Sequence, residues 1–81
     1  MEYNTITAID IGTTKIATIV AQYSKSGSIE ILGHSVVPCK GLSKGNVVDV
    51  EKTSEGISQS ISILRQYYNL NIKSAFLGIT G

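Results

Sequence analysis

The sequence DIGTTK, which begins at Asp10, combines the residue types that bind phosphate groups and a divalent cation. Gly12 lets the backbone turn and approach a ligand closely. Thr13 and Thr14 add hydroxyls and two consecutive N–H groups that can form an anion-binding concavity. Lys15 adds a positive charge, and the carboxylate of Asp10 could hold Mg²⁺ through water. The spacing therefore predicts a phosphate site with a cation-binding carboxylate beside it.

An ordinary hairpin turn is the alternative interpretation of the same segment, with Asp10 and the two threonines satisfying backbone donors. Neither a Walker A loop, G-x-x-x-x-G-K-[ST], nor the pattern G-x-G-x-x-G occurs in the chain. We expect Asp10 to end a strand covered on both faces, where an ionised carboxylate must be paired or bound to a cation. The residues of this segment alone leave both interpretations open.

The remaining candidates point to structure rather than to chemistry. GLSKG, residues 41–45, is interpreted as a surface connection with solvated lysines, although a loop of this kind can bind an anion. The single His34 is expected to be an ordinary strand residue, and Cys39 a bystander. One Cys and one His are too few for a zinc site and exclude an internal disulfide. No nucleophile–base pair can be assembled, so we predict no catalytic residue in these 81 residues.

The composition is that of one small globular domain. Apolar residues make up 42% of the chain and charged residues 16%, and the net charge is +1. The basic residues are spread along the chain, which argues against a nucleic-acid-binding surface. No signal peptide is recognisable, and the longest apolar runs are too short to span a bilayer. The single cysteine indicates a reducing, cytoplasmic environment.

Three strands are expected before a long helix, at residues 5–11, 16–23 and 28–38. The first two lack a clean alternation of apolar and polar residues, which predicts strands covered on both faces. Only residues 12–15 separate them, so they should form an antiparallel hairpin. Gly33 within the third strand predicts a bulge or a close backbone approach.

The helix is expected over residues 50–68, with Asp49 as its N-cap. Gly56 predicts close packing of the helix on the sheet, and Asn69 and Asn71 are suited to ending it in the left-handed conformation. The apolar stripe consists of Ile57, Ile61, Leu64 and Tyr68. A last strand, residues 72–81, should return parallel to the first.

The predicted fold is therefore α/β, a mixed sheet built in the order strand-strand-strand-helix-strand. One helix covers only one face of such a sheet. Because the first two strands are expected to be buried on both faces, something outside this chain should cover the other face.

The segment AIDIGTTK resembles the first phosphate loop of the actin and heat-shock chaperone ATPase superfamily. Further along, GLSKGNVVDVE before the helix and GITG at the last strand make nearly the whole chain similar to the bacterial cell-division protein FtsA family. The resemblance implies that residues 1–81 are a single partial domain, the opening part of an actin-like (ribonuclease H-like) ATPase lobe. A truncated form or a gene fragment would have this extent.

In that family, the resemblance implies, the whole protein binds ATP and Mg²⁺, polymerises, and anchors the FtsZ ring at the membrane of the division site. Asp10 would correspond to the Mg²⁺-associated acid, and Gly12, Thr13 and Thr14 to the phosphate-contacting turn. Lys15 follows in place and would approach the phosphates. The membrane contact would be made by a C-terminal helix that these residues do not contain, on the cytoplasmic side.

Two other functions are compatible with the sequence. One is a stand-alone structural module that self-associates through an exposed sheet face or edge. The other is a different actin-like ATPase, of the pilus-assembly or chaperone-like kind.

Overall fold

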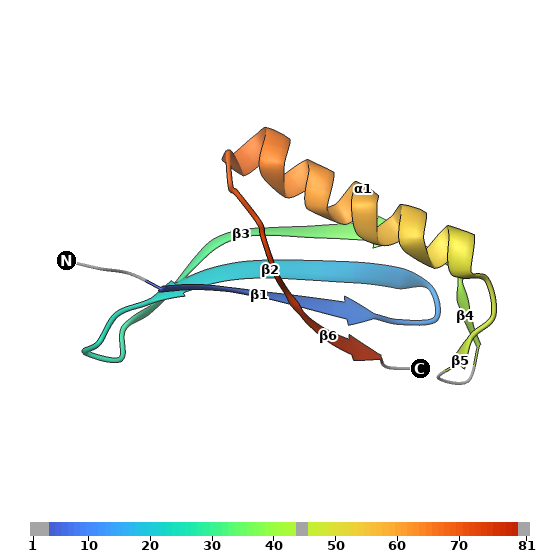
Figure 1. The fold of residues 1–81 in the computed structure, drawn as a ribbon, viewed down its shortest axis with the longest axis horizontal. Helices are drawn as coiled ribbons and strands as arrows, with labels where there is room; N and C mark the ends of the chain where they lie inside the picture. The colour runs from blue at the N-terminus through green and yellow to red at the C-terminus, as the bar shows by residue number, and fades with distance from the viewer. Residues whose placement is uncertain (1–3, 44–45, 80–81) are drawn as a thin grey trace.

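The main sheet has four strands, in the order β3-β2-β1-β6, and one long helix packs on one of its faces (Figure 1). The computed structural model describes residues 4–43 and 46–79. The sheet and the helix form two layers. Their elements are β1 (Asn4–Ile11), β2 (Lys15–Tyr23), β3 (Ile29–Pro38), α1 (Val50–Tyr68) and β6 (Phe76–Ile79). The pairs β1–β2 and β2–β3 are antiparallel, whereas β6 runs parallel to β1. The predicted hairpin and the parallel return of the last strand are therefore confirmed.

A short hairpin that the sequence did not predict lies between β3 and α1. There β4 (Leu42–Ser43) pairs antiparallel with β5 (Asn46–Val47). Lys44 and Gly45 fall outside the described residues. The predicted element order therefore lacked two short strands, and the predicted last strand was too long at its start, because regular pairing begins only at Phe76.

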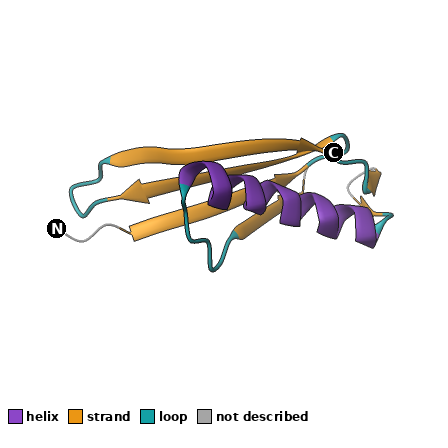
Figure 2. Ribbon diagram, turned by 90° about the horizontal axis from the view of Figure 1, so that it is seen from above, coloured by secondary structure: helices purple, strands orange, loops and turns teal. Residues whose placement is uncertain are grey.

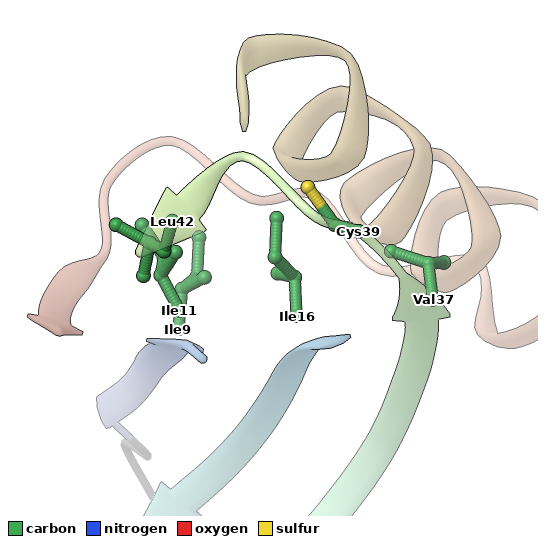
Figure 3. Close-up of a cluster of buried hydrophobic side chains, with 6 residues drawn as sticks. All are labelled: Ile9, Ile11, Ile16, Val37, Cys39 and Leu42. Carbon is green, nitrogen blue, oxygen red and sulfur yellow. The ribbon is translucent and has the colours of Figure 1, made fainter. Parts of the chain in front are cut away.

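Leu42 is a core residue, so the expectation of a purely surface connection at residues 41–45 is wrong at this position. The backbone of Gly41 folds the segment inward, because its C=O accepts hydrogen bonds from the N–H groups of Val48 (2.8 Å) and Asp49 (3.1 Å). This pairing carries the side chain of Leu42 onto the end of the sheet, where it joins the buried cluster shown in Figure 3.

Burial in β1 and β2 alternates along the strands, contrary to the prediction of coverage on both faces. Ile9, Ile11 and Ile16 are buried beneath α1, whereas Ile6 and Ile19, on the opposite face, are exposed. Figure 2 shows the reason, since the single helix lies on one side of the sheet. The predicted cover from outside this chain stays a prediction.

Two buried clusters hold α1 on the sheet. The larger one lies under the N-terminal half of the helix and consists of Ile9, Ile11, Ile16, Val37, Cys39 and Leu42 (Figure 3). The second, under the C-terminal half, consists of Val20, Leu64 and Ile72. The helix packs mainly against β3 and β2, which leaves Leu77 and Ile79 of β6 exposed.

Both ends of α1 are capped as predicted. The side chain of Asp49 accepts a hydrogen bond from the N–H of Lys52 at 2.9 Å. Asn69 adopts the left-handed conformation at φ 54° and ψ 39°, and its N–H donates to the C=O of Leu64. Asn71, the other expected stop residue, does not take a positive φ.

Two glycines permit the close packing that their positions predicted. At Gly33 a Cβ would lie 2.8 Å from Cγ of Tyr68, and the register of the β2–β3 pair shifts at the same place. At Gly56 a Cβ would lie 2.7 Å from Cδ1 of Ile16. Such contacts are shorter than real Cβ atoms make, so each glycine lets helix and sheet approach more closely than alanine would.

The line of α1 that faces the sheet is more polar than the predicted stripe. Its buried residues are Thr53, Gly56, Ser60 and Leu64. Of the predicted stripe, only Leu64 is buried: Ile57 and Ile61 are partly buried and flank this line, and Tyr68 is exposed. Small side chains are favoured on this line because the helix lies close to the sheet.

Candidate functional site

The hairpin tip, which we define as residues 12–15, connects the carboxyl end of β1 to the start of β2. The N–H of Gly12 donates to the C=O of Lys15 at 2.9 Å and closes the turn. Thr13, Thr14 and Lys15 are exposed, and Gly12 is half-buried. The structure therefore presents these four predicted phosphate residues together, at one end of the sheet.

The N–H groups of Thr13 and Thr14 meet no backbone acceptor within the part of the chain that the structure describes. The C=O of Thr14, in contrast, accepts a hydrogen bond of 2.9 Å from the N–H of Cys39. The tip is thus bonded to the segment after β3 through the C=O of Thr14. Consecutive N–H groups of two exposed threonines, with the hydroxyls beside them, are a donor set that fits a phosphate group.

Asp10 is exposed, which contradicts the expectation that its carboxylate is buried. In the sheet it lies opposite Ala17 of β2 and Gly78 of β6. Its neighbours in sequence are buried under α1, so the alternation of the strand places Asp10 on the uncovered face. There it lines a shallow hollow of about 440 Å³ together with Ala8, Ala17, Ile19 and Phe76 among others.

The parallel pairing of β1 and β6 brings DIGTTK and the start of GITG to the same end of the sheet. Gly78 lies opposite Asp10, and Ile79 opposite Ile11. Thr80 and Gly81, the rest of GITG, fall outside the described residues. The N-terminal end of α1 lies at this end of the molecule too (Figure 1). Carboxyl ends of parallel strands are where open α/β sheets commonly bind ligands.

The other residues considered from the sequence do not join this group. His34 is exposed on β3 opposite Ile19. The described residues contain no cluster of three or more His, Cys, Asp or Glu side chains that could hold a metal. Within residues 4–43 and 46–79, no helix has the length and apolar character needed to cross a membrane.

Cys39 has a structural role at the tip that sequence reasoning missed. It is buried in the larger cluster, and its Sγ donates a hydrogen bond of 3.4 Å to the C=O of Lys52. Together with its N–H bond to Thr14, this contact joins the tip to α1. No sequence signal marks such a contact, because it depends on where the chain after β3 crosses the end of the sheet.

The chain is similar to cell-division proteins of several bacteria, although no family model matches it. It is 38% identical to cell division protein FtsA of Pseudomonas aeruginosa over 76 residues, which are 94% of this chain and 18% of that protein. It is 31% identical to FtsA of Borreliella burgdorferi over 81 residues (100% of this chain, 20% of that protein). For FtsA of Streptococcus pneumoniae the identity is 31% over 75 residues (93% and 16%).

The chain thus spans about a fifth of the length of these relatives, or less. The matches cover the strands, the tip and the helix alike, because they extend over nearly all of the chain. They confirm the resemblance inferred from the sequence: the chain corresponds to a segment of the cell-division protein FtsA family.

Proposed function

We propose that this chain carries the first phosphate loop of an FtsA-like, actin-family ATP-binding protein of cell division. The observation that carries the proposal is the exposed hairpin tip at the carboxyl end of β1, with Asp10 two residues before it. The similarity to FtsA proteins supports the proposal, because the sequence DIGTTK lies inside the matched segment.

Each residue has a defined part in this proposal. The N–H groups and hydroxyls of Thr13 and Thr14 bind phosphate oxygens, and Gly12 lets the backbone approach them. Lys15 adds a charge-assisted contact. Asp10 accepts hydrogen bonds from water molecules of a hydrated Mg²⁺, which neutralises phosphate charge when bound. No residue of this chain is assigned a catalytic step.

The whole protein would act at the division site. We propose that it anchors the FtsZ ring to the inner face of the membrane, with ATP and Mg²⁺ bound between two lobes of which this segment forms part of one. The isolated 81 residues would bind nucleotide weakly or not at all, since they supply only one wall of such a cleft.

A chimera tests the phosphate assignment. These 81 residues replace the matching segment of Pseudomonas aeruginosa FtsA, and binding of Mg-ATP is measured by titration calorimetry. Asp10→Ala is expected to weaken binding by about 10- to 100-fold, the usual effect of losing a residue that acts on a metal through its bound ligands. Glu30→Ala, which removes an exposed carboxylate on β3, is the control. Equal affinity of the two variants for Mg-ATP would contradict the phosphate assignment and leave DIGTTK as an ordinary hairpin turn.

A self-associating structural module is the second candidate function, and the uncovered sheet face favours it. Seven large apolar side chains on that face are exposed among the described residues: Ile6, Ile19, Tyr23, Ile29, Ile31, Val36 and Phe76. A contiguous apolar face of this kind promotes association. Tight Mg-ATP binding by the chimera would favour the first function; a stable dimer of the 81 residues alone would favour the second.

A further inference from the structure

Gly56 lies where α1 meets Ile16, just after the hairpin tip, and Cys39, just after β3. A Cβ at this position would lie 2.7 Å from Cδ1 of Ile16 and 3.1 Å from Sγ of Cys39. Ile16 is completely buried and immediately follows the tip, and Cys39 is buried beside it (Figure 3). The helix backbone therefore rests directly on these two side chains, and an added methyl group would force Cδ1 of Ile16 to shift.

Cys39 carries this contact on to the tip. Its N–H donates to the C=O of Thr14 at 2.9 Å. Its Sγ donates to the C=O of Lys52 at 3.4 Å, one helical turn before Gly56. Cys39 is thus bonded to the tip through its backbone N–H and to α1 through its side chain.

We propose that the turn of α1 at residues 52–56 positions the hairpin tip through Ile16 and Cys39. Because the backbone of α1 at Gly56 packs directly against Ile16 and Cys39, a displacement of α1 across the sheet shifts Cys39 and, through its bond to Thr14, the hairpin tip. Gly56 and Cys39 are positioning residues, and neither is assigned a contact with a ligand. The consequence for nucleotide affinity rests on the proposed function; the mechanical coupling itself does not.

Gly33 of β3, which packs against the C-terminal end of α1, offers a matched control. A Cβ there would lie 2.8 Å from Cγ of Tyr68, a contact as tight as the one at Gly56. Gly33→Ala therefore also forces a side chain between helix and sheet to shift, but the side chain is that of Tyr68, the last residue of the helix, away from the tip.

Amide hydrogen exchange in the 81-residue chain, followed by NMR, separates the two effects. Gly56→Ala is expected to speed exchange of the Cys39 N–H about tenfold relative to the slowest amides of β2, the factor that loss of one hydrogen bond allows. Gly33→Ala should leave this ratio within about twofold. The proposal is overturned if Gly56→Ala leaves the ratio unchanged, or if both variants raise it equally.

A second variant keeps the test decisive if Gly56→Ala does not fold. Ile16→Val removes the Cδ1 atom that the new methyl group would meet, so Ile16→Val with Gly56→Ala should fold and retain slow exchange at Cys39. Failure of this combination to recover the ratio would show that the Ile16 contact does not transmit the effect, because the contact between the added methyl group and Cys39 Sγ, at 3.1 Å, is still present. Titration of the chimera with Mg-ATP then distinguishes the two proposals. If Gly56→Ala speeds exchange of the Cys39 N–H selectively but leaves the affinity for Mg-ATP unchanged, the positioning role is retained and the phosphate assignment is refuted.

Discussion

The hydroxyls of Thr18 and Ser60, 42 positions apart in the chain, lie 2.7 Å from each other in the interior between β2 and α1. Ser35 of β3, directly opposite Thr18 in the sheet, completes the cluster. Its hydroxyl lies 2.5 Å from that of Ser60 and donates to the Ser60 C=O at 2.9 Å. All three residues are buried, so a small polar network rather than apolar packing fills the centre of this interface.

Ser60→Ala is expected to lower the free energy of unfolding by about 1–3 kcal/mol, because it leaves the buried Thr18 hydroxyl without this partner. Urea unfolding measures the loss. Ser58→Ala, on the exposed side of α1, should change stability by less than about 0.5 kcal/mol. Adding Thr18→Val to Ser60→Ala should recover part of the loss; no recovery would mean that the hydroxyl pair is not its cause.

Asn69→Ala is expected to destabilise the chain by about 1–2 kcal/mol, since alanine disfavours the left-handed conformation found there. Asn69→Gly should preserve stability, because glycine adopts that conformation without a steric penalty. Thermal unfolding followed by circular dichroism compares the two. Equal stability of both variants would contradict the observed helix end.

Asp49→Ala should cost about 1 kcal/mol through loss of the N-cap bond to the N–H of Lys52. Asp49→Ser is the matched variant and should retain most of the stability, since serine also caps helices well. The backbone C=O of residue 49, which accepts from the Thr53 hydroxyl at 2.9 Å, is kept in both. A serine variant as unstable as the alanine variant would point to a role for the charge instead.

Ile19→Thr with Val36→Thr should reduce any concentration-dependent association of the 81-residue chain, because both side chains are exposed on the uncovered face. Light scattering after size exclusion measures the mass. Tyr67→Ser removes an even more exposed apolar side chain, on α1, and should leave association unchanged. Loss of association in the Tyr67 variant alone would place the contact on the helix.

The sequence by itself determined the features that depend on neighbours in the chain. The helix at residues 50–68 and the caps at Asp49 and Asn69 were predicted correctly, because periodicity and capping act over a few residues. The two close-packed positions, Gly33 and Gly56, could also be predicted, because a glycine inside an element lets a neighbouring side chain pack against its backbone.

Only the tertiary structure decided what the chain's path brings together. Leu42 is buried because the segment after β3 folds back as a hairpin. Ser60 is buried because it meets Thr18 and Ser35 of the sheet across the interface. Asp10 is exposed because one helix covers one face, and the alternation of β1 then assigns it to the other. The residues of the tip could be identified from the sequence. The bond between Thr14 and Cys39 that holds the tip could not, because it depends on long-range packing that no local pattern encodes.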